Sequence, residues 1–132
     1  LNPCFDRLYN SVYQSLIWLQ PPVGRRTTCR AMALEVFRFA QENRSVFSFM
    51  FFDGRNLFHE DAEVRAFYAF LTRFVSRPRG HTAGWQPDDM PYNLLEIIIT
   101  TISYQCAEGV IKLSEQDFMD HVNFYLERCI ED

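Results

Sequence analysis

The stretch from residue 91 to 109, PYNLLEIIITTISYQCAEG, has hardly any polar side chains in its first half. Its β-branched residues would also suit a strand, but its length, the proline near its start and the glycine at its end favour a helix. A helix that is apolar nearly all round must be covered on more than one side. The sequence therefore predicts a helical protein in which this segment lies between other helices.

Apolar residues recur at helical spacing in four further segments of the chain. The predicted helices span 3–20, 28–43, 61–76 and 115–131, and a predicted loop rich in Gly and Pro spans 77–89. Pro3 suits the first turn of the first helix, and Thr27 or Thr28 can cap the second. Ser114 and Asp117 resemble a capping box at the start of the last helix.

The segment SVFSFMFFDGRNLFHE, which begins at Ser45, is ambiguous by itself. Phe47, Phe49 and Phe51 alternate as in a strand, while the pairs Phe47/Phe51 and Phe49/Phe52 have helical spacing. No neighbouring segment has a hairpin pattern, and an isolated strand would leave its backbone groups unpaired. We therefore expect a short helix that is capped by Ser45 and ends near the following Asp-Gly turn. One phenylalanine pair is expected to pack into the scaffold and the other to border a pocket.

Length and composition indicate one folded domain over residues 1–132, so the predicted fold is an all-α bundle of about six helices. The net charge of −4 and the dispersed arginines, which we expect to be solvated, exclude a concentrated basic face for nucleic acid. No apolar segment is long enough to span a membrane. Cys4, Cys29, Cys106 and Cys129 lack metal-ligand spacing, so we expect no metal site and free thiols in a reducing cytoplasm.

The sequence also lacks the common catalytic motifs. It has no GxSxG, HExxH or glycine-rich phosphate loop, and His59, His81 and His121 lie in separate segments. We therefore expect neither an enzyme nor a cofactor. Two polar residues of the apolar helix leave their roles open, because Glu96 and Gln105 could each face a cavity, a partner subunit or solvent.

The aromatic content suggests a pocket between helices. Aromatic residues make up 16% of the chain and include 13 Phe, and pockets between helices are commonly lined by aromatic side chains with a few polar groups. Plain core packing is the alternative explanation for any single phenylalanine.

The segments 91–109 and 115–131 form a hairpin whose apolar surface is large for one small domain. Two such hairpins packed about a twofold axis would make a four-helix bundle, and so a homodimer. A central helix buried within a monomer would look similar. The residues predicted at the dimer interface are Leu95, Ile98, Ile99, Ile102, Phe118, Val122 and Tyr125.

The order of these helices resembles a known family. A second helix that ends LEVFRFAQENRSVFSFMFF, and a long apolar helix that closes on CAEGVIKLSEQDFMDHVNFYLERCI, are similar to the C-terminal ligand-binding and dimerisation domain of TetR/AcrR-type transcriptional repressors. The resemblance implies a pocket among 3–20, 28–43, 61–76 and 91–109, and a dimer bundle made by 91–109 and 115–131. The family's N-terminal helix-turn-helix is absent, and the first residue is Leu1 rather than Met, so we expect a fragment of a longer regulator.

The expected function is effector sensing and dimerisation in a TetR-like repressor of the cytoplasm. A small apolar or aromatic ligand would control DNA binding, and nucleic acid would be bound only by the missing N-terminal domain. The residues predicted to bind the ligand are Trp18, Phe37, Phe47, Phe51, Tyr68, Trp85 and Tyr104. The alternative is a helical protein–protein interaction module with an apolar groove and no small-molecule ligand.

Overall fold

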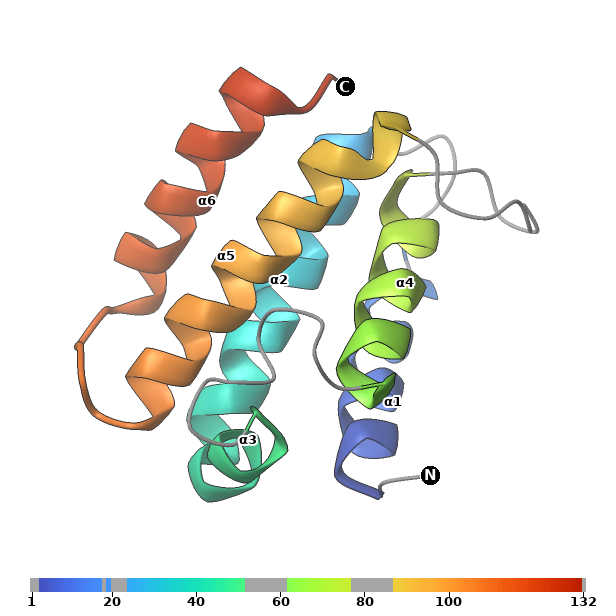
Figure 1. Ribbon diagram of the computed structural model, residues 1–132. Helices are drawn as coiled ribbons and strands as arrows, with labels where there is room; N and C mark the ends of the chain where they lie inside the picture. The colour runs from blue at the N-terminus through green and yellow to red at the C-terminus, as the bar shows by residue number, and fades with distance from the viewer. Residues whose placement is uncertain (1–2, 18, 20–23, 52–61, 77–86, 132) are drawn as a thin grey trace.

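The computed structural model describes residues 3–17, 19, 24–51, 62–76 and 87–131, and all regular structure in these ranges is helical (Figure 1). In chain order the elements are α1 (Pro3–Ile17), α2 (Arg25–Glu42), α3 (Arg44–Phe51), α4 (Ala62–Ser76), the 3₁₀ turn η2 (Pro87–Asp89), α5 (Met90–Ala107) and α6 (Glu115–Cys129). The predicted all-α class is confirmed. Residues 52–61 and most of the predicted loop 77–89 lie outside the described residues.

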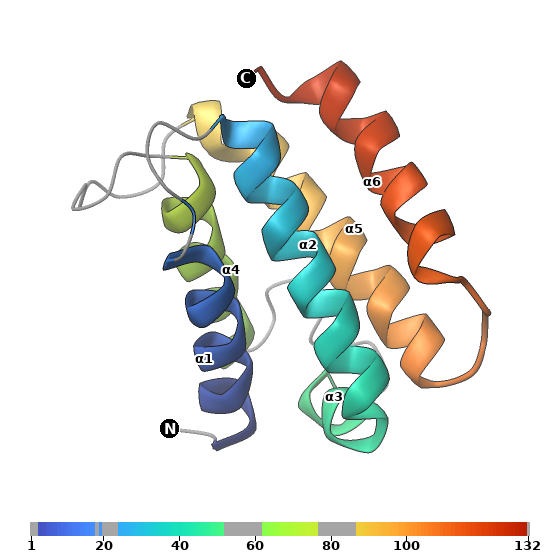
Figure 2. The same cartoon turned by 180° about the vertical axis from the view of Figure 1, so that it is seen from behind.

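The bundle is built around α2 and α5, which lie side by side at its centre (Figures 1 and 2). α1 and α4 flank this pair on one side, α6 lies along the other side, and α3 closes one end. α5 packs against α2, α3, α4 and α6. The expectation that the apolar helix needs several covering partners is therefore confirmed.

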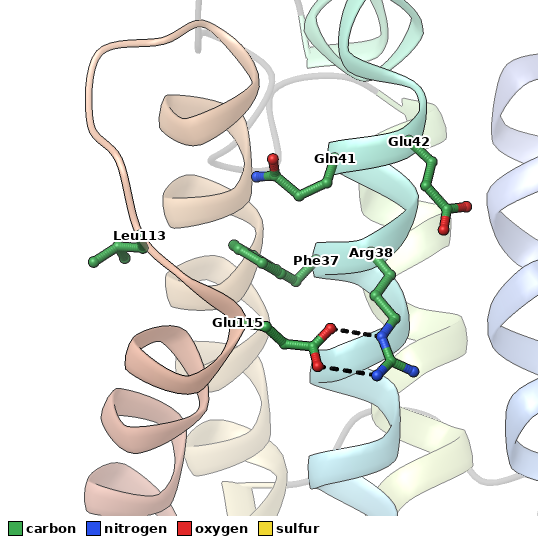
Figure 3. A pocket seen from close by; sticks show the side chains of 6 residues that line it. All are labelled: Phe37, Arg38, Gln41, Glu42, Leu113 and Glu115. Atoms are coloured by element: carbon green, nitrogen blue, oxygen red, sulfur yellow. Dashed lines mark hydrogen bonds and ion pairs between the residues drawn. The ribbon is translucent and has the colours of Figure 1, made fainter.

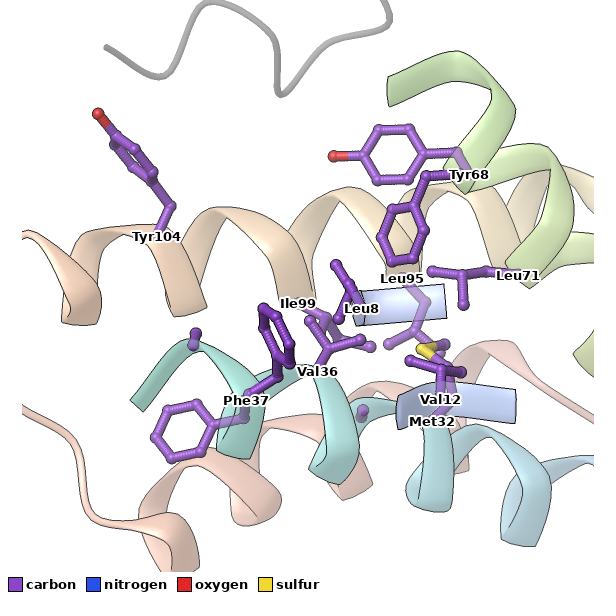
Figure 4. Packing of buried hydrophobic residues seen from close by; sticks show 14 of the residues in the cluster. Leu8, Val12, Met32, Val36, Phe37, Tyr68, Leu71, Leu95, Ile99 and Tyr104 are labelled. Atoms are coloured by element: carbon purple, nitrogen blue, oxygen red, sulfur yellow. The ribbon is translucent and has the colours of Figure 1, made fainter. Parts of the chain in front are cut away.

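One apolar core joins the helices, because each helix turns its apolar stripe inward (Figure 4). Fully buried aliphatic members include Leu8, Val12, Met32, Val36, Leu71, Leu95 and Ile99. Aromatic rings link the helices further: the centroid of Phe5 in α1 lies 5.7 Å from that of Phe51 in α3 and 6.1 Å from that of Phe67 in α4. Such edge-to-face pairs stabilise a core beyond the area they bury.

The predicted threonine cap of the second helix is wrong. α2 begins three residues earlier than expected, and its cap is Gly24, which has an extended backbone (φ −63°, ψ 152°). Thr28 already lies in the first turn, where its hydroxyl donates to the Gly24 carbonyl oxygen at 3.3 Å. Threonine hydroxyls inside helices commonly bond back to the preceding turn in this way, so Thr27 and Thr28 are not available as caps.

The segment after Asn43 is a helix, as predicted, but Ser45 does not cap it. α3 starts at Arg44, directly after α2 ends, and the Asn43 carbonyl accepts a hydrogen bond from the Phe47 amide at 2.8 Å. Asn43 thus ends one helix and begins the next, because its backbone (φ −132°, ψ 52°) breaks the helical path for a single residue. Ser45 is already inside the first turn.

The connection between α5 and α6 begins at the predicted glycine and ends at the predicted serine cap. Gly109 has φ +77°, a left-handed conformation that favours glycine, and its amide donates to the Cys106 carbonyl. Ser114 caps α6 by accepting a hydrogen bond from the Asp117 amide at 3.1 Å, which confirms that half of the predicted capping box. The observed helices are slightly shorter at their C-terminal ends than the predicted 91–109 and 115–131.

Two arginines near the ends of α2 fasten the last turns of α5 and α6. Arg26 donates from Nε to the Ile130 carbonyl at 2.7 Å, just beyond α6. Arg44 donates to the carbonyls of Cys106 (2.7 Å) and Ala107 (3.2 Å), which end α5. Carbonyls at the end of a helix have no amide of a following turn to pair with fully, and the helix dipole makes this end attractive to a cation.

Two more arginines of α2 reach the side chains of α6. Arg30 donates to Asn123 Oδ1 at 2.7 Å, and Arg38 makes a two-pronged ion pair with Glu115 at 2.6 and 3.0 Å. The Arg38 guanidinium holds the pKa of the Glu115 carboxyl below its usual value. The expectation that the arginines are merely solvated is therefore wrong for these positions. Arg26, Arg30, Arg38 and Arg44 are called the latch arginines below.

Replacement of Arg44 by Ala is expected to lower the free energy of unfolding by about 1–2 kcal/mol, because it removes charge-assisted hydrogen bonds to the end of α5. Arg73→Ala is the matched control, since Arg73 is also exposed and lies in the last turn of α4. The control should change stability by less than about 0.5 kcal/mol. Urea unfolding followed by circular dichroism measures both values. Equal losses would show that Arg44 acts only as a surface charge.

Candidate ligand-binding site

Phe47 and Phe51, two of the predicted ligand-binding residues, are fully buried in the scaffold. Their ring centroids lie 4.8 Å apart, and Phe51 also packs on Phe5. Phe49 points the other way and is 67% exposed. Of the two phenylalanine pairs, Phe47/Phe51 is therefore the one that packs into the scaffold, while Phe52 lies outside the described residues.

Phe37 packs toward α6 instead. Its ring stacks on Phe118 with centroids 4.2 Å apart and an angle of 18° between the planes. A surface depression of about 350 Å³ lies beside it, between α2 and the start of α6 (Figure 3). The depression is lined by Phe37, Arg38, Gln41, Glu42, Leu113 and Glu115. Most of these side chains are polar and the Arg38–Glu115 ion pair lies among them, so this place does not suit an apolar ligand.

The two predicted tyrosines stand on the same side of α5 (Figure 4). Tyr68, from α4, is fully buried, and burial raises the pKa of its hydroxyl, although the nearby Thr100 hydroxyl acts in the opposite direction. Tyr104 is 9% exposed, and its hydroxyl donates to Glu108 Oε1 at 3.1 Å. Burial thus favours the protonated form of the Tyr68 hydroxyl beside α5. Trp18 and Trp85, the remaining predicted ligand residues, lie outside the described residues.

A stripe of polar residues runs along the inner face of α5 and its cap. Spacings of four, three, four and three residues place Asp89, Asn93, Glu96, Thr100 and Ser103 on one side of the helix. Four of the five are buried, and Asn93 is partly buried. α4 packs against α5 and contributes two more buried hydroxyls, those of Tyr68 and Thr72. These seven residues are called the polar seam below.

Glu96 is the centre of the polar seam and has no exposed surface. The Thr72 Oγ1 atom lies 2.6 Å from Glu96 Oε2 and 3.0 Å from Asn93 Oδ1. A hydroxyl has one hydrogen, so it donates to one of these oxygens at a time. A protonated Glu96 can donate to Thr72 while Thr72 donates to Asn93, and this arrangement pairs all three groups.

Burial raises the pKa of Glu96 well above its usual value, and the nearby charge of Asp89 raises it further. The hydrogen bond from Thr72 acts in the opposite direction but does not outweigh burial. Burial therefore favours the protonated, neutral form of Glu96 in the folded chain. The sequence left open whether Glu96 faces a cavity, a partner subunit or solvent. Glu96 does not face solvent, because it is fully buried.

Three atoms of the polar seam remain unpaired. Glu96 Oε1, Thr100 Oγ1 and Ser103 Oγ are buried and have no hydrogen-bond partner among the residues that the structure describes. Leaving a polar group buried without a partner costs about 1–3 kcal/mol, so such atoms mark a place for water or a ligand. Sequence reasoning missed Thr100 and Ser103, although their spacing from Glu96 along one helix face was a usable signal.

The outer face of α5 is apolar. Met90 and Leu94 are each 47% exposed and Ile98 is 39% exposed, at intervals of four residues along one side of the helix. Glu96 is the only charged residue between Met90 and Ala107, and it points inward. α5 thus differs from an ordinary amphipathic helix on both faces. Its buried face carries polar groups, and its exposed face carries no charged residue. Met90, Leu94 and Ile98 are called the outer stripe below.

The structure divides the predicted dimer residues into two groups. Leu95, Ile99, Phe118 and Val122 are buried within the core of the single chain. Ile98 belongs to the outer stripe, while Ile102 and Tyr125 are partly buried. The Tyr125 hydroxyl donates to the Pro91 carbonyl, which ties α6 to the start of α5.

None of the helices within the described ranges is long and apolar enough to cross a membrane. In the same part of the chain, no group of three or more His, Cys, Asp or Glu side chains could hold a metal ion. All four cysteines are free thiols. Comparison of the chain with protein-family models, curated proteins and solved structures gave no match.

Glu96→Gln is expected to stabilise the protein increasingly as pH rises. Above pH 4.5 the folded chain retains the Glu96 proton that the unfolded chain has released, so wild-type stability falls until the folded pKa is passed. The variant lacks this loss. Its advantage should be small below pH 4.5 and then grow by up to about 1.4 kcal/mol per pH unit.

Urea unfolding over a series of pH values measures this difference. Glu42→Gln, at an exposed position of α2, is the matched control and should show no growing advantage. A Glu96→Gln variant whose relative stability does not change with pH would contradict a neutral buried carboxyl.

Proposed function

We propose that this chain is the effector-sensing and dimerisation domain of a TetR-like transcriptional regulator. The observation that carries the proposal is the polarity of α5, which is polar on its buried side and apolar on its exposed side. A second copy of the chain would cover the outer stripe, and an effector would meet the unpaired groups of the polar seam. DNA would be bound by a helix-turn-helix domain that this sequence does not include.

A second copy is the occupant that best suits the outer stripe. The stripe is uncharged, so it can lie against an identical stripe across a twofold axis without electrostatic repulsion. α6 runs beside α5, and its Phe124 is 59% exposed and has Arg128 stacked over its ring at 3.5 Å. Two α5–α6 hairpins would then form a four-helix bundle. Leu94 and Ile98 would contact the partner, while Leu95 and Ile99 support the same helix from inside.

Effector binding would act through α5, because the polar seam and the outer stripe occupy opposite sides of this helix. A ligand that favours one position of α5 changes the relative orientation of two paired subunits only if its affinity differs between the two arrangements. Release of DNA by the effector therefore requires that the effector bind the DNA-free arrangement more tightly.

The double variant Leu94→Glu, Ile98→Glu is expected to be a monomer. Size-exclusion chromatography with light scattering should give the wild type twice the chain mass of 15.7 kDa and the variant a single chain mass. The reason is that four carboxylates would meet at the twofold axis without partners. Phe49→Glu is the control, because it also places a carboxylate on an exposed apolar residue, here in α3, and should leave the dimer intact.

A monomeric wild type would contradict dimerisation and favour the alternative module that binds a partner helix along the outer stripe. The coding sequence upstream of Leu1 tests the regulator separately. A region of about 50 residues without a helix-turn-helix pattern there would contradict a TetR-like regulator.

A further inference from the structure

The contact between α4 and α5 differs in character from the contact between α2 and α5. Toward α2, α5 presents buried aliphatic side chains, since Leu95 and Ile99 lie among Met32 and Val36 (Figure 4). Toward α4, α5 presents the polar seam. We propose that α4 is a lid, which moves away from α5 in a minor state of the folded chain and lets water reach the polar seam. The inference concerns a single chain, so it holds whether or not the chain dimerises.

The polar seam lies along most of α4. Thr72 Oγ1 lies 2.6 Å from Glu96 Oε2, and one turn earlier in α4 the Tyr68 hydroxyl is close to Glu96 and Thr100, which both act on its pKa. The facing residue thus moves back along α4 as the chain advances along α5, so the two helices run antiparallel. The same register places the first turn of α4 beside Ser103.

The closed position of α4 leaves polar atoms of the seam without partners. Glu96 Oε1, Thr100 Oγ1 and Ser103 Oγ are buried and unpaired among the described residues. All three lie on the face of α5 that α4 covers, so each would gain a hydrogen bond from water when α4 moves away. The closed interface therefore carries a cost in free energy that the open state does not.

Apolar burial keeps the closed state dominant. Val64, Phe67, Leu71 and Val75 of α4 are almost fully buried, and a displaced α4 exposes part of their surface to water. Opening is therefore rare. It still costs less than the displacement of a helix whose buried contacts are all apolar, because hydration of the seam offsets part of the loss.

The place of α4 in the fold allows it to move alone. α4 lies on the flank of the central α2–α5 pair that is opposite α6 (Figures 1 and 2). The latch arginines fasten α6 and the end of α5 to α2, so these contacts persist when α4 is displaced. α2 and α5 also stay packed through their aliphatic side chains. The movement is then local and does not require the bundle to unfold.

Thiol labelling measures access to the seam. Thr100→Cys places a reporter on the face that α4 covers, and Val36→Cys places an equally buried reporter between α2 and α5. The whole chain is treated with excess iodoacetamide, and peptide mass spectrometry locates the alkylated sites among the four native thiols. The thiol at position 100 should react at least about tenfold faster than the thiol at position 36.

The effect of urea on these rates separates local opening from global unfolding. Displacement of α4 exposes little surface, so labelling at position 100 should rise only slightly at low urea concentrations. Labelling at position 36 requires global unfolding and should rise steeply. Ser103→Cys is a second reporter on the same face and should behave like Thr100→Cys. It keeps the test decisive where Thr100→Cys does not fold.

A further substitution tests the physical cause. Ser103→Ala, added to Thr100→Cys, removes one of the unpaired hydroxyls and with it part of the gain from hydration. Labelling at position 100 should then slow by roughly fivefold or more.

The proposal is overturned if positions 100 and 36 react at equal rates with the same urea dependence, or if Ser103→Ala leaves the rate at position 100 unchanged. Light scattering on the same samples reports dimerisation separately. A dimer whose seam reacts no faster than position 36 contradicts only the lid, and a monomer whose seam reacts rapidly contradicts only dimerisation.

Discussion

The arrangement of this protein depends on the burial of α5. This helix is too apolar to lie on the surface of a bundle, and α2, α3, α4 and α6 cover most of its circumference. The central position of α2 has the same cause, because α2 is the long helix against which both α5 and α6 pack. The side of α5 that stays uncovered carries Met90, Leu94 and Ile98. In the proposed dimer this side would contact the second copy.

The α5–α6 hairpin is held to the rest of the bundle by two kinds of contact. Buried apolar contacts such as Phe37 on Phe118 supply cohesion, and the latch arginines fix the position of the hairpin along α2. Hydrogen bonds from a guanidinium are directional, whereas apolar packing tolerates small shifts. In the proposed regulator, a hairpin fastened near the ends of its helices, with the polar seam along α5, would transmit a small displacement of α5 as a rigid-body movement.

Sequence periodicity predicted most of the fold because helical burial is a local pattern. The stripes of α1, α4 and α6 could be read directly, and the Ser114 cap and the Gly109 terminus follow from backbone preferences of single residues. The caps assigned to Thr28 and Ser45 failed because neighbouring residues offered an equally good start, and nothing local chooses between them. The latch arginines were missed for a different reason, since their partners lie between 62 and 104 positions away along the chain.

Some features of the candidate site could likewise be predicted from the sequence, and others could not. The sequence alone determined that α5 is a helix requiring several neighbours and that the chain has an aromatic surplus, because composition and spacing carry this information. It left the role of Glu96 open. Only the tertiary structure decided that Glu96 is buried against Thr72, that Phe47 and Phe51 belong to the scaffold, and that Leu94 and Ile98 face outward. The physical reason is that spacing defines the faces of a helix, but which face is buried depends on helices brought together from distant parts of the chain.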